Sequence, residues 1–364
     1  MAPRVPVARP RLPSAAALGP LLEEIDRNGI YTNYGPLSHR LEERLAERFG
    51  LPSSCVTTVA NGTAGLMVAL LAAGACPGRY CLMPSWTFSA TGHAAVAAGL
   101  VPYFLDVDAQ TWALTSGQVL EVLEQLGDQV GAVIAVSPFG APLDIGVWDA
   151  FSRRHDVPVV IDAAGGFDSF TRGESLAVVS LHATKVLGAG EGGFVVSTRP
   201  ERIQAVRKRA NFGLYGQREA AVIGFNGKLS EYHAAIGLAG LDEWAVIRRE
   251  FEVASATYRR AFAAIDGARW LHGFASQWVS STCIVGLDMP KASALAGALA
   301  RRGIDSRAWW GRGLHTHPAF ASYPRVPLPV TDTLADSTLG LPLFRGIEEE
   351  QICDVANIVA AELA

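Results

Sequence analysis

The sequence predicts an α/β protein with a mostly parallel central sheet and a smaller C-terminal α/β domain. From residue 55 onward, apolar strand-like runs alternate with helix-like runs, the pattern of parallel strands covered by helices on both faces. The length of 364 residues exceeds what a single core usually holds. We therefore expect an N-terminal arm over 1–14, a large domain over 15–245 and a small domain over 246–364.

Composition narrows the class of protein. Hydrophobic residues make up 49% of the chain and charged residues 18%, which excludes a disordered chain and suggests apolar surface hidden between subunits. A net charge of -4 gives no electrostatic case for a nucleic-acid partner. No apolar run is long enough for a membrane span. The five cysteines form no C-x-x-C pair, so we expect buried thiols in the reducing cytoplasm.

The first half of the chain supplies most of the expected sheet. A helix ending at Gly29, the turn YTNYGP and the amphipathic helix SHRLEERLAERFG come first. The expected strands are CVTTVA, YCLMPSW, VPYFLDV, GAVIAVSPFG and VPVVIDAA, and the helices between them are GTAGLMVALLAAG, SATGHAAVAAG, SGQVLEVLEQLG and GVWDAFSRRH. Each helix therefore connects two successive strands, a repeat that predicts a mostly parallel sheet covered on both faces.

The pattern changes in the second half. LAVVS and FVVST are expected strands with no helix between them, followed by the helix ERIQAVRKRANFG. The run from 230 to 265 is continuously amphipathic and predicts a long helical connection between the two domains. The small domain is expected to contain the strand STCIVGL and the helices KASALAGALARRG and EEEQICDVANIVAAEL.

Three glycines in SLHATKVLGAGEGG match a nucleotide-binding pattern but have another interpretation. Gly188, Gly190 and Gly193 spell G-x-G-x-x-G, the dinucleotide fingerprint. That fingerprint must open a helix, whereas these glycines lead into a strand. We therefore expect them to let the chain pass close to Lys185 and turn into an antiparallel strand.

Three polar features stand at the ends of expected strands. Asp162 closes VPVVID, Lys185 follows LAVVSLHAT, and the helix start 61–64 follows CVTTVA. Each alone has an ordinary explanation as a turn, a cap or a solvated lysine. Together they offer a carboxylate for a pyridinium nitrogen, an amine for an aldehyde and a helix N-terminus for a phosphate. This set predicts a pyridoxal 5'-phosphate site.

Six segments carry a resemblance to a known family. They are NGTAGL (61–66), MPSWTFSAT (83–91), FLDVDAQT (104–111), VVIDAA (159–164), SLHATKVLGAGEGG (180–193) and GFNGKLSEYHAAIGLAGL (224–241). In this order they resemble the nucleotide-sugar aminotransferases of the DegT/DnrJ/EryC1/StrS family. The resemblance implies the PLP-dependent transferase fold type I, of the aspartate-aminotransferase kind, and a homodimer with active sites at the subunit interface.

The resemblance assigns roles at the cofactor ring. It implies that Lys185 forms the Schiff base with the cofactor and moves the substrate proton as general base and acid. It implies that Asp162 pairs with the ring nitrogen and that Trp86 stacks on the ring, although core packing of this tryptophan is an equal alternative from the residues alone.

The resemblance also assigns the phosphate site. Ser180 and the backbone amides of Thr63 and Ala64 are implied to bind the cofactor phosphate, together with Asn226 from the neighbouring subunit. Judged on their own, the serine would bond to its local backbone and the asparagine would form a turn.

The sequence departs from the family pattern at two places. Gly165 stands where the family commonly has a glutamine that contacts the cofactor ring. Ser137 and Phe139 stand where histidine and tyrosine are frequent. Recognition of the substrate is therefore expected to differ.

Substrate contacts are less defined. Tyr31, Thr32 and Asn33 in the first turn are candidates for sugar contacts, and the cluster SRAWWGRG, from Ser306 to Gly313, could bind a diphosphate and a base through Arg307 or form a domain contact. His315 is a candidate on a substrate-facing loop. It stands two residues from a second histidine, without acidic or sulfur partners at ligand spacing, so we expect no metal site.

The expected reaction has two stages. An amino donor, glutamate by resemblance, converts the cofactor to pyridoxamine 5'-phosphate, and a nucleotide-linked keto-deoxysugar then accepts the amine. A 4-keto-6-deoxyhexose is favoured over a 3-keto isomer. The alternatives are a cofactor-dependent sugar dehydratase, in which a histidine replaces the lysine, and a catalytically idle regulator or partner subunit of the same fold. Lys185 argues against the dehydratase. Lys185 and Asp162 together argue against the idle subunit, and the missing glutamine at Gly165 keeps that alternative open.

Overall fold

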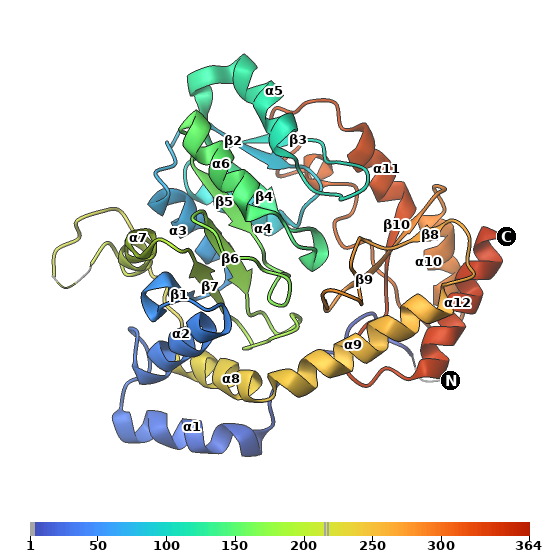
Figure 1. Ribbon diagram of the computed structural model, residues 1–364, viewed down its shortest axis with the longest axis horizontal. Helices are drawn as coiled ribbons and strands as arrows, with labels where there is room; N and C mark the ends of the chain where they lie inside the picture. The colour runs from blue at the N-terminus through green and yellow to red at the C-terminus, as the bar shows by residue number, and fades with distance from the viewer. Residues whose placement is uncertain (1–3, 215, 217) are drawn as a thin grey trace.

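A computed structural model describes residues 4–214, 216 and 218–364, so residues 1–3 of the expected arm lie outside it. The molecule contains a seven-stranded sheet and a three-stranded sheet, which lie toward opposite ends of its long axis (Figure 1). Among the described residues, no helix combines the length and the apolar character that a membrane crossing requires.

The seven-stranded sheet has the order β1-β7-β6-β5-β4-β2-β3. Its strands are β1 (Val56–Val59), β2 (Tyr80–Pro84), β3 (Val101–Leu105), β4 (Val130–Val136), β5 (Val159–Asp162), β6 (Leu176–Ser180) and β7 (Gly193–Val196). β7 runs in the opposite direction to the other six strands, and it lies between β1 and β6. The predicted α/β fold with a mostly parallel sheet is confirmed, and the helix-free step from LAVVS to FVVST is the β6–β7 antiparallel pair.

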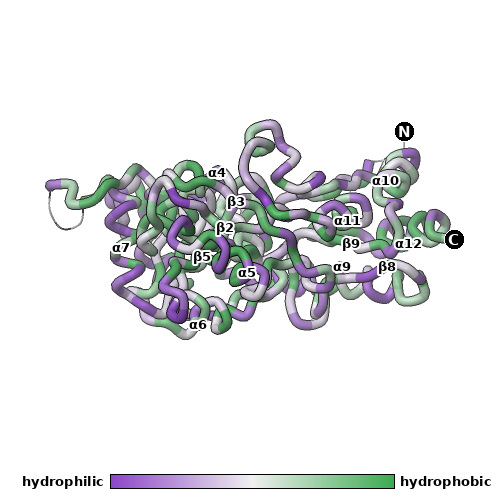
Figure 2. The backbone as a smooth tube through the Cα atoms, turned by 90° about the horizontal axis from the view of Figure 1, so that it is seen from above, coloured by the Kyte–Doolittle hydropathy of each residue, from purple (hydrophilic) through white to green (hydrophobic). Residues whose placement is uncertain are grey.

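Helices cover both faces of this sheet. They are α1 (Ala15–Asn28), α2 (Pro36–Arg48), α3 (Gly62–Ala72), α4 (Ser89–Ala97), α5 (Ser116–Leu126), α6 (Ile145–His155), α7 (Pro200–Ala210) and α8 (Glu231–Asp242). Successive strand residues alternate between two hydrophobic clusters: Val159 and Ile161 join the cluster with α2 and α6, and Val160 joins the cluster with α3 and α4. Because strand side chains alternate between faces, the two clusters lie on opposite sides of the sheet. Figure 2 shows α7 as a largely hydrophilic helix at the outer end.

The second sheet is small and antiparallel. It has the order β10-β9-β8, with β8 (Ala268–Arg269), β9 (Cys283–Leu287) and β10 (Thr338–Leu341). The helices around it are α9 (Trp244–Ala261), α10 (Ala292–Arg301), α11 (Pro329–Ser337) and α12 (Glu349–Leu363). The sequence did not predict β8, β10 or α11, since a two-residue strand and a short strand directly after a helix have no periodicity of their own.

The long amphipathic run is two helices rather than one. α8 ends at Asp242 and α9 begins at Trp244, with Glu243 at the junction (φ -89°, ψ 0°). α8 packs against α1 and α2, whereas α9 packs against α12 of the small domain. Because the two halves bury their apolar faces against different partners, the chain must change direction between them. Figure 1 shows α9 running from the large sheet toward the small one.

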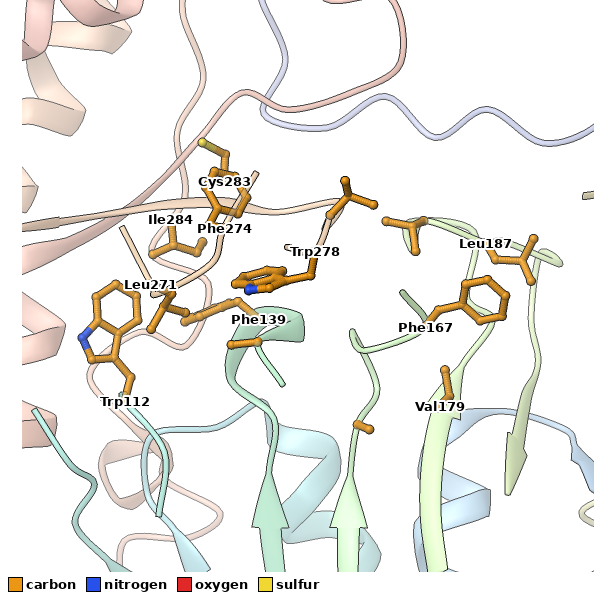
Figure 3. Packing of buried hydrophobic residues seen from close by; sticks show 14 of the residues in the cluster. Trp112, Phe139, Phe167, Val179, Leu187, Leu271, Phe274, Trp278, Cys283 and Ile284 are labelled. Atoms are coloured by element: carbon orange, nitrogen blue, oxygen red, sulfur yellow. The ribbon is translucent and has the colours of Figure 1, made fainter. Parts of the chain in front are cut away.

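A hydrophobic core continues from one sheet to the other. Phe139 and Phe167, from loops of the large sheet, belong to the same buried cluster as Trp278 and Cys283 near β9 (Figure 3). The hydroxyl of Ser280 donates to the Phe139 carbonyl over 2.7 Å across this junction. The predicted boundary near residue 245 stays a prediction.

Part of the C-terminal half returns to the large sheet. The Phe104 N–H of β3 donates to the Pro324 carbonyl (3.0 Å), and the Val326 N–H donates to the Phe104 carbonyl (3.1 Å). Leu314 and Phe320 are buried in the hydrophobic cluster that contains α4. This segment therefore lies along the outer edge of β3.

The N-terminal arm is pinned to the small domain. The Val5 N–H donates to the Gly303 carbonyl (3.0 Å), and the Leu343 N–H donates to the Val7 carbonyl (3.1 Å). Farther along, Leu12 lies against Gly188 in the loop between β6 and β7, since a Cβ added to that glycine would be 2.9 Å from the leucine side chain. The arm thus links the small domain to the loop that carries Lys185.

Candidate active site

Asp162 is held by hydrogen bonds at the end of β5. It is 5% exposed, and its carboxylate accepts bonds from the Thr91 hydroxyl (2.8 Å) and the Ala164 N–H (3.2 Å). The Thr87 and Thr91 hydroxyl oxygens are 2.7 Å apart, and because Thr91 gives its hydrogen to Asp162, Thr87 is the donor to Thr91. This chain fixes the carboxylate through α4 and leaves some of its lone pairs free.

The charges of Lys185 and Asp162 influence each other. Burial raises the pKa of Asp162, with the bonds from Thr91 and Ala164 and then the positive charge of Lys185 acting in the opposite direction. Burial lowers the pKa of Lys185, and the charge of Asp162 raises it. The structure therefore brings these two predicted residues within electrostatic range of each other. A lysine with a lowered pKa has more of the neutral, nucleophilic amine at neutral pH than an exposed one.

Glycines allow the lysine loop to pass the start of α3. A Cβ added to Gly193 would lie 3.2 Å from the Gly62 nitrogen and 3.0 Å from the Val179 carbonyl oxygen. Gly190 has a φ of 85°, a backbone conformation that other residues rarely adopt. The expected role of the G-x-G-x-x-G glycines, close passage and a turn into an antiparallel strand, agrees with this geometry.

The expected phosphate-binding residues meet at the N-terminus of α3. A Cβ added to Gly62 would lie 3.3 Å from the Ser180 Cβ, so the serine at the end of β6 is adjacent to the first turn of the helix. Asn61 caps that helix, and its side chain accepts the Ala64 N–H over 2.8 Å. The Ala64 amide, predicted to bind phosphate, is therefore already bonded, and Thr63 next to it lies in the same first turn.

These groups fit pyridoxal 5'-phosphate. A buried carboxylate whose own hydrogen bonds come from neutral donors can accept a bond from a protonated ring nitrogen, which would offset the burial that raises the Asp162 pKa. Lys185 supplies an amine, and the start of α3 supplies helix-terminal amides beside the Ser180 hydroxyl for a phosphate.

Trp86 lies among other aromatic rings. It is 3% exposed, with the Trp310 ring 5.5 Å and the Phe139 ring 6.4 Å away between centroids. Trp310 itself stacks on Phe139 at 3.8 Å and 18°. Stacking of Trp86 on the cofactor therefore stays a prediction beside an observed packing role. Phe88, two residues on, is 58% exposed at the N-cap of α4, the helix that carries Thr91.

The predicted substrate residues of the C-terminal half are engaged in internal contacts. The Arg307 guanidinium lies 4.7 Å from the Trp309 ring centroid, and its backbone pairs with Gly340 of β10. His315 Nδ1 is 2.7 Å from the Ser85 hydroxyl, directly before Trp86. Burial lowers the pKa of this histidine. His315 thus helps to join the C-terminal half to the end of β2, whereas the contacts of Arg307 lie within the small domain.

The remaining predicted residues lie on loops. Tyr31, Thr32 and Asn33 form the turn before α2, where Tyr31 stacks on Tyr232 at 6.2 Å. Asn226, between α7 and α8, accepts a 2.7 Å hydrogen bond from Lys228. No contact in the structure links these four predicted residues to Asp162, and their roles stay predictions.

The missing glutamine has a steric explanation. A Cβ added to Gly165 would lie 3.1 Å from the Gly140 nitrogen and 3.4 Å from the Phe139 carbonyl carbon. A larger side chain would push against this backbone unless it shifted. The tight contact also accompanies the left-handed conformation of Phe139, whose φ is 53°.

Sequence reasoning missed two residues at the site. Thr91 donates a hydrogen bond to Asp162, and Phe88, at the N-cap of the helix that carries Thr91, is exposed. The available signal was TFSAT directly after the β2 strand: a threonine in the first turn of a helix that starts at the same sheet edge as Asp162.

Comparison with known proteins identifies the family. The sequence profile of the DegT/DnrJ/EryC1/StrS aminotransferase family matches residues 16–360. Protein Rv3402c of Mycobacterium tuberculosis is 35% identical over 379 residues, which covers 99% of this chain and 89% of that protein. The dTDP-4-amino-4,6-dideoxy-D-glucose transaminase of Shigella dysenteriae is 32% identical over 267 residues, 72% of this chain and 71% of that enzyme.

The solved structures include a close match in fold. The crystal structure of DesI in the presence of its TDP-sugar product superimposes with a TM-score of 0.88 at 29% identity and covers 99% of this chain and 93% of DesI. With the site geometry and the match to the family along nearly its whole length, the chain belongs to the DegT/DnrJ/EryC1/StrS aminotransferase family and is a pyridoxal-phosphate-dependent sugar aminotransferase.

Proposed function

We propose that the enzyme moves an amino group from L-glutamate to a nucleotide-linked 4-keto-6-deoxyhexose, with a 3-keto isomer as the second candidate. The observation that supports the proposal is that Lys185 and Asp162 lie within electrostatic range of each other, with Asp162 at the end of β5 and Lys185 in the loop after β6. The 4-keto assignment is supported by the similarity to a transaminase named for a dTDP-4-amino-4,6-dideoxy sugar. The products would serve deoxyaminosugar synthesis for lipopolysaccharide O-antigens or antibiotics.

Lys185 and Asp162 divide the proton chemistry. When bound, pyridoxal 5'-phosphate accepts the electron pair that remains on the substrate carbon after its proton leaves. Asp162, held by Thr91, keeps a negative charge beside the ring nitrogen so that this nitrogen stays protonated. Lys185 binds the cofactor at rest. It then carries the proton between the substrate carbon and the cofactor, a role that its lowered pKa favours.

The other predicted residues position the ligands. Thr63 and Ser180 hold the phosphate at the start of α3, and Ala64 contributes its amide if Asn61 releases it. Trp86, with Phe88 beside it, supplies the aromatic wall. The predicted sugar contacts are Tyr31, Thr32, Asn33, Arg307 and His315.

We further propose a homodimer in the cytoplasm, in which Asn226 of one copy reaches the phosphate in the other. Exposed apolar side chains at Ile30, Tyr31 and Tyr232 give one surface to bury on association. All five cysteines are free thiols, which supports a reducing compartment, although only Cys55, Cys81 and Cys283 are buried as expected and Cys76 and Cys353 are exposed.

The experiment that tests this proposal is a screen of amino donors against nucleotide keto-sugars. We expect glutamate and a dTDP- or UDP-linked 4-keto-6-deoxyhexose to give a product in which the keto C=O has become CH–NH₂, heavier by the difference between NH₃ and O, with the amine position assigned by NMR. Formation of a deoxygenated sugar without nitrogen would instead support the dehydratase alternative. A protein that binds cofactor but changes no donor or acceptor would support the idle-subunit alternative.

A further inference from the structure

A cavity beside Lys185 is lined by arginines that the cofactor chemistry does not use. It is a shallow cavity that is open to solvent, and its wall includes Lys185, Arg9, Arg11 and Arg345. Among the described residues that line it, no side chain is acidic.

Three separate segments of the chain form the wall of this cavity. The arm is fixed to the small domain at Val5 and Val7, and from there Arg9 places its guanidinium 4.9 Å from the Phe344 ring centroid. Arg345 is the residue after Phe344 and lies in the segment between β10 and α12. The loop between β6 and β7 contributes Lys185. The site therefore exists only when the arm, the small domain and the lysine loop are assembled.

Positive charge at this wall is only partly balanced. The Arg345 side chain is 7% exposed and forms an ion pair with Glu250, which is also 3.9 Å from Arg11. Arg9 and Arg11 are exposed to solvent. The three arginines thus stand against one carboxylate, an arrangement that attracts anions to this wall.

We infer that this cavity binds the carboxylate groups of a dicarboxylic amino-acid donor, with Arg9, Arg11 and Arg345 as the recognising residues. The inference rests on the proposed function in that it takes an amino acid as the donor. Guanidinium groups pair with carboxylates through two parallel hydrogen bonds, which gives both affinity and orientation. A second carboxylate requires a second cation, and the wall has more than one.

Geometry favours the donor over the nucleotide as the occupant. The α-carboxylate of an amino acid is one carbon away from the amino group, so it must lie next to Lys185, as this wall does. The diphosphate of a nucleotide-linked sugar is separated from the keto carbon by the sugar ring and therefore lies farther from the lysine.

The first test measures binding of an unreactive dicarboxylate. Glutarate is titrated into the holoenzyme by calorimetry, with pyrophosphate titrated in parallel as the probe for a nucleotide site. We expect Arg9→Gln and Arg11→Gln each to weaken glutarate binding by about tenfold, since each removes one charge-assisted contact. Arg345→Lys keeps a charge for Glu250 and should weaken binding less than the loss of a charge would. The matched control is Arg27→Gln, the same change on the exposed last turn of α1.

Glutarate that does not bind the wild-type enzyme, or binds it and both variants equally, overturns the inference. Pyrophosphate binding that replaces glutarate binding and is lost in the variants also overturns it, because the wall would then belong to the acceptor.

The second test separates this inference from the proposed function. The half-reaction with glutamate is followed by the absorbance change of the bound cofactor, without any sugar. We expect the KM for glutamate to rise about tenfold in the Arg9 and Arg11 variants with little change in kcat. A wild-type enzyme that reacts with no amino acid would contradict the proposed function. A wild type that reacts, with variants that react identically, contradicts only the role of the arginines.

Discussion

The edge of the large sheet that holds Asp162 and Lys185 is built differently from the C-terminal segments that carry Trp310 and Arg345. At the sheet edge, each group is fixed by the strand that ends there and by a close backbone approach, as at Gly193. In the C-terminal segments, side chains are fixed by each other across long sequence separations, as Trp310 is by Phe139. The difference teaches that local backbone geometry positions the groups predicted to bind the cofactor, whereas tertiary packing positions the groups proposed to bind substrates.

The largest expected effect is at Lys185. Lys185→Ala should lower turnover by about 10⁴-fold or more, because both the cofactor attachment and the proton carrier are lost. The chain has four lysines, so borohydride reduction of the holoenzyme followed by peptide mass analysis can assign the modified one. We expect only the peptide with Lys185 to carry the cofactor, and Lys208→Ala on α7 to behave as wild type. Label on another lysine would contradict the assignment.

The next effect is at Asp162. Asp162→Asn should reduce turnover by about 10²–10³-fold, the usual loss when one group that stabilises developing charge is removed. Because the helix terminus and Ser180 remain, we expect the variant still to bind cofactor, measured by fluorescence titration of the apoprotein. Unchanged turnover would show that the carboxylate does not act on the ring nitrogen.

A smaller effect is expected in the C-terminal segments. Trp310→Ala removes a half-buried ring that stacks on Phe139, and we expect a loss of about 2–3 kcal/mol in the free energy of unfolding, measured in urea. Trp309→Ala is the matched control, since that ring contacts Arg307 instead. If Trp310→Ala left stability intact and raised only the KM for the sugar, the ring would be a substrate contact and the comparison of the two regions would fail.

The smallest effect is a change in stability of the apoprotein with pH. Burial raises the pKa of Asp162 in the folded state, so its charged form is disfavoured there relative to the unfolded chain. Stability linked to this group is present at low pH and is lost as pH rises above the unfolded pKa. The Tm of Asp162→Asn apoprotein should therefore exceed that of wild type, by more near about pH 7 than near about pH 4. The opposite trend, measured by scanning calorimetry, would mean that the carboxylate stabilises the apoprotein.

The sheet and the cofactor residues were predictable because strands and strand ends leave a local signal. Apolar runs of strand length predicted each strand of the large sheet. Asp162 and Lys185 were recognisable as polar residues at or soon after the ends of such runs. The same local logic explains the glycines between β6 and β7.

The contacts among distant segments were not predictable. Nothing in the sequence indicates that Ser85 bonds to His315, since this contact depends on how the C-terminal half packs on the large sheet. The contact of Arg9 with Phe344 likewise depends on how the arm packs on the small domain. The break at Glu243 was missed for the same reason: amphipathic periodicity continues through it, and only the two different packing partners require the turn.

The segment that lies along β3 has a consequence for solubility. β3 is the last strand of the large sheet, and an uncovered last strand offers its free N–H and C=O groups to any other extended chain. Pro324 and Val326 occupy those groups at Phe104, and the proline leaves no donor of its own there for further pairing. The C-terminal half thus also acts as a guard against intermolecular strand addition, so its displacement would lead first to aggregation.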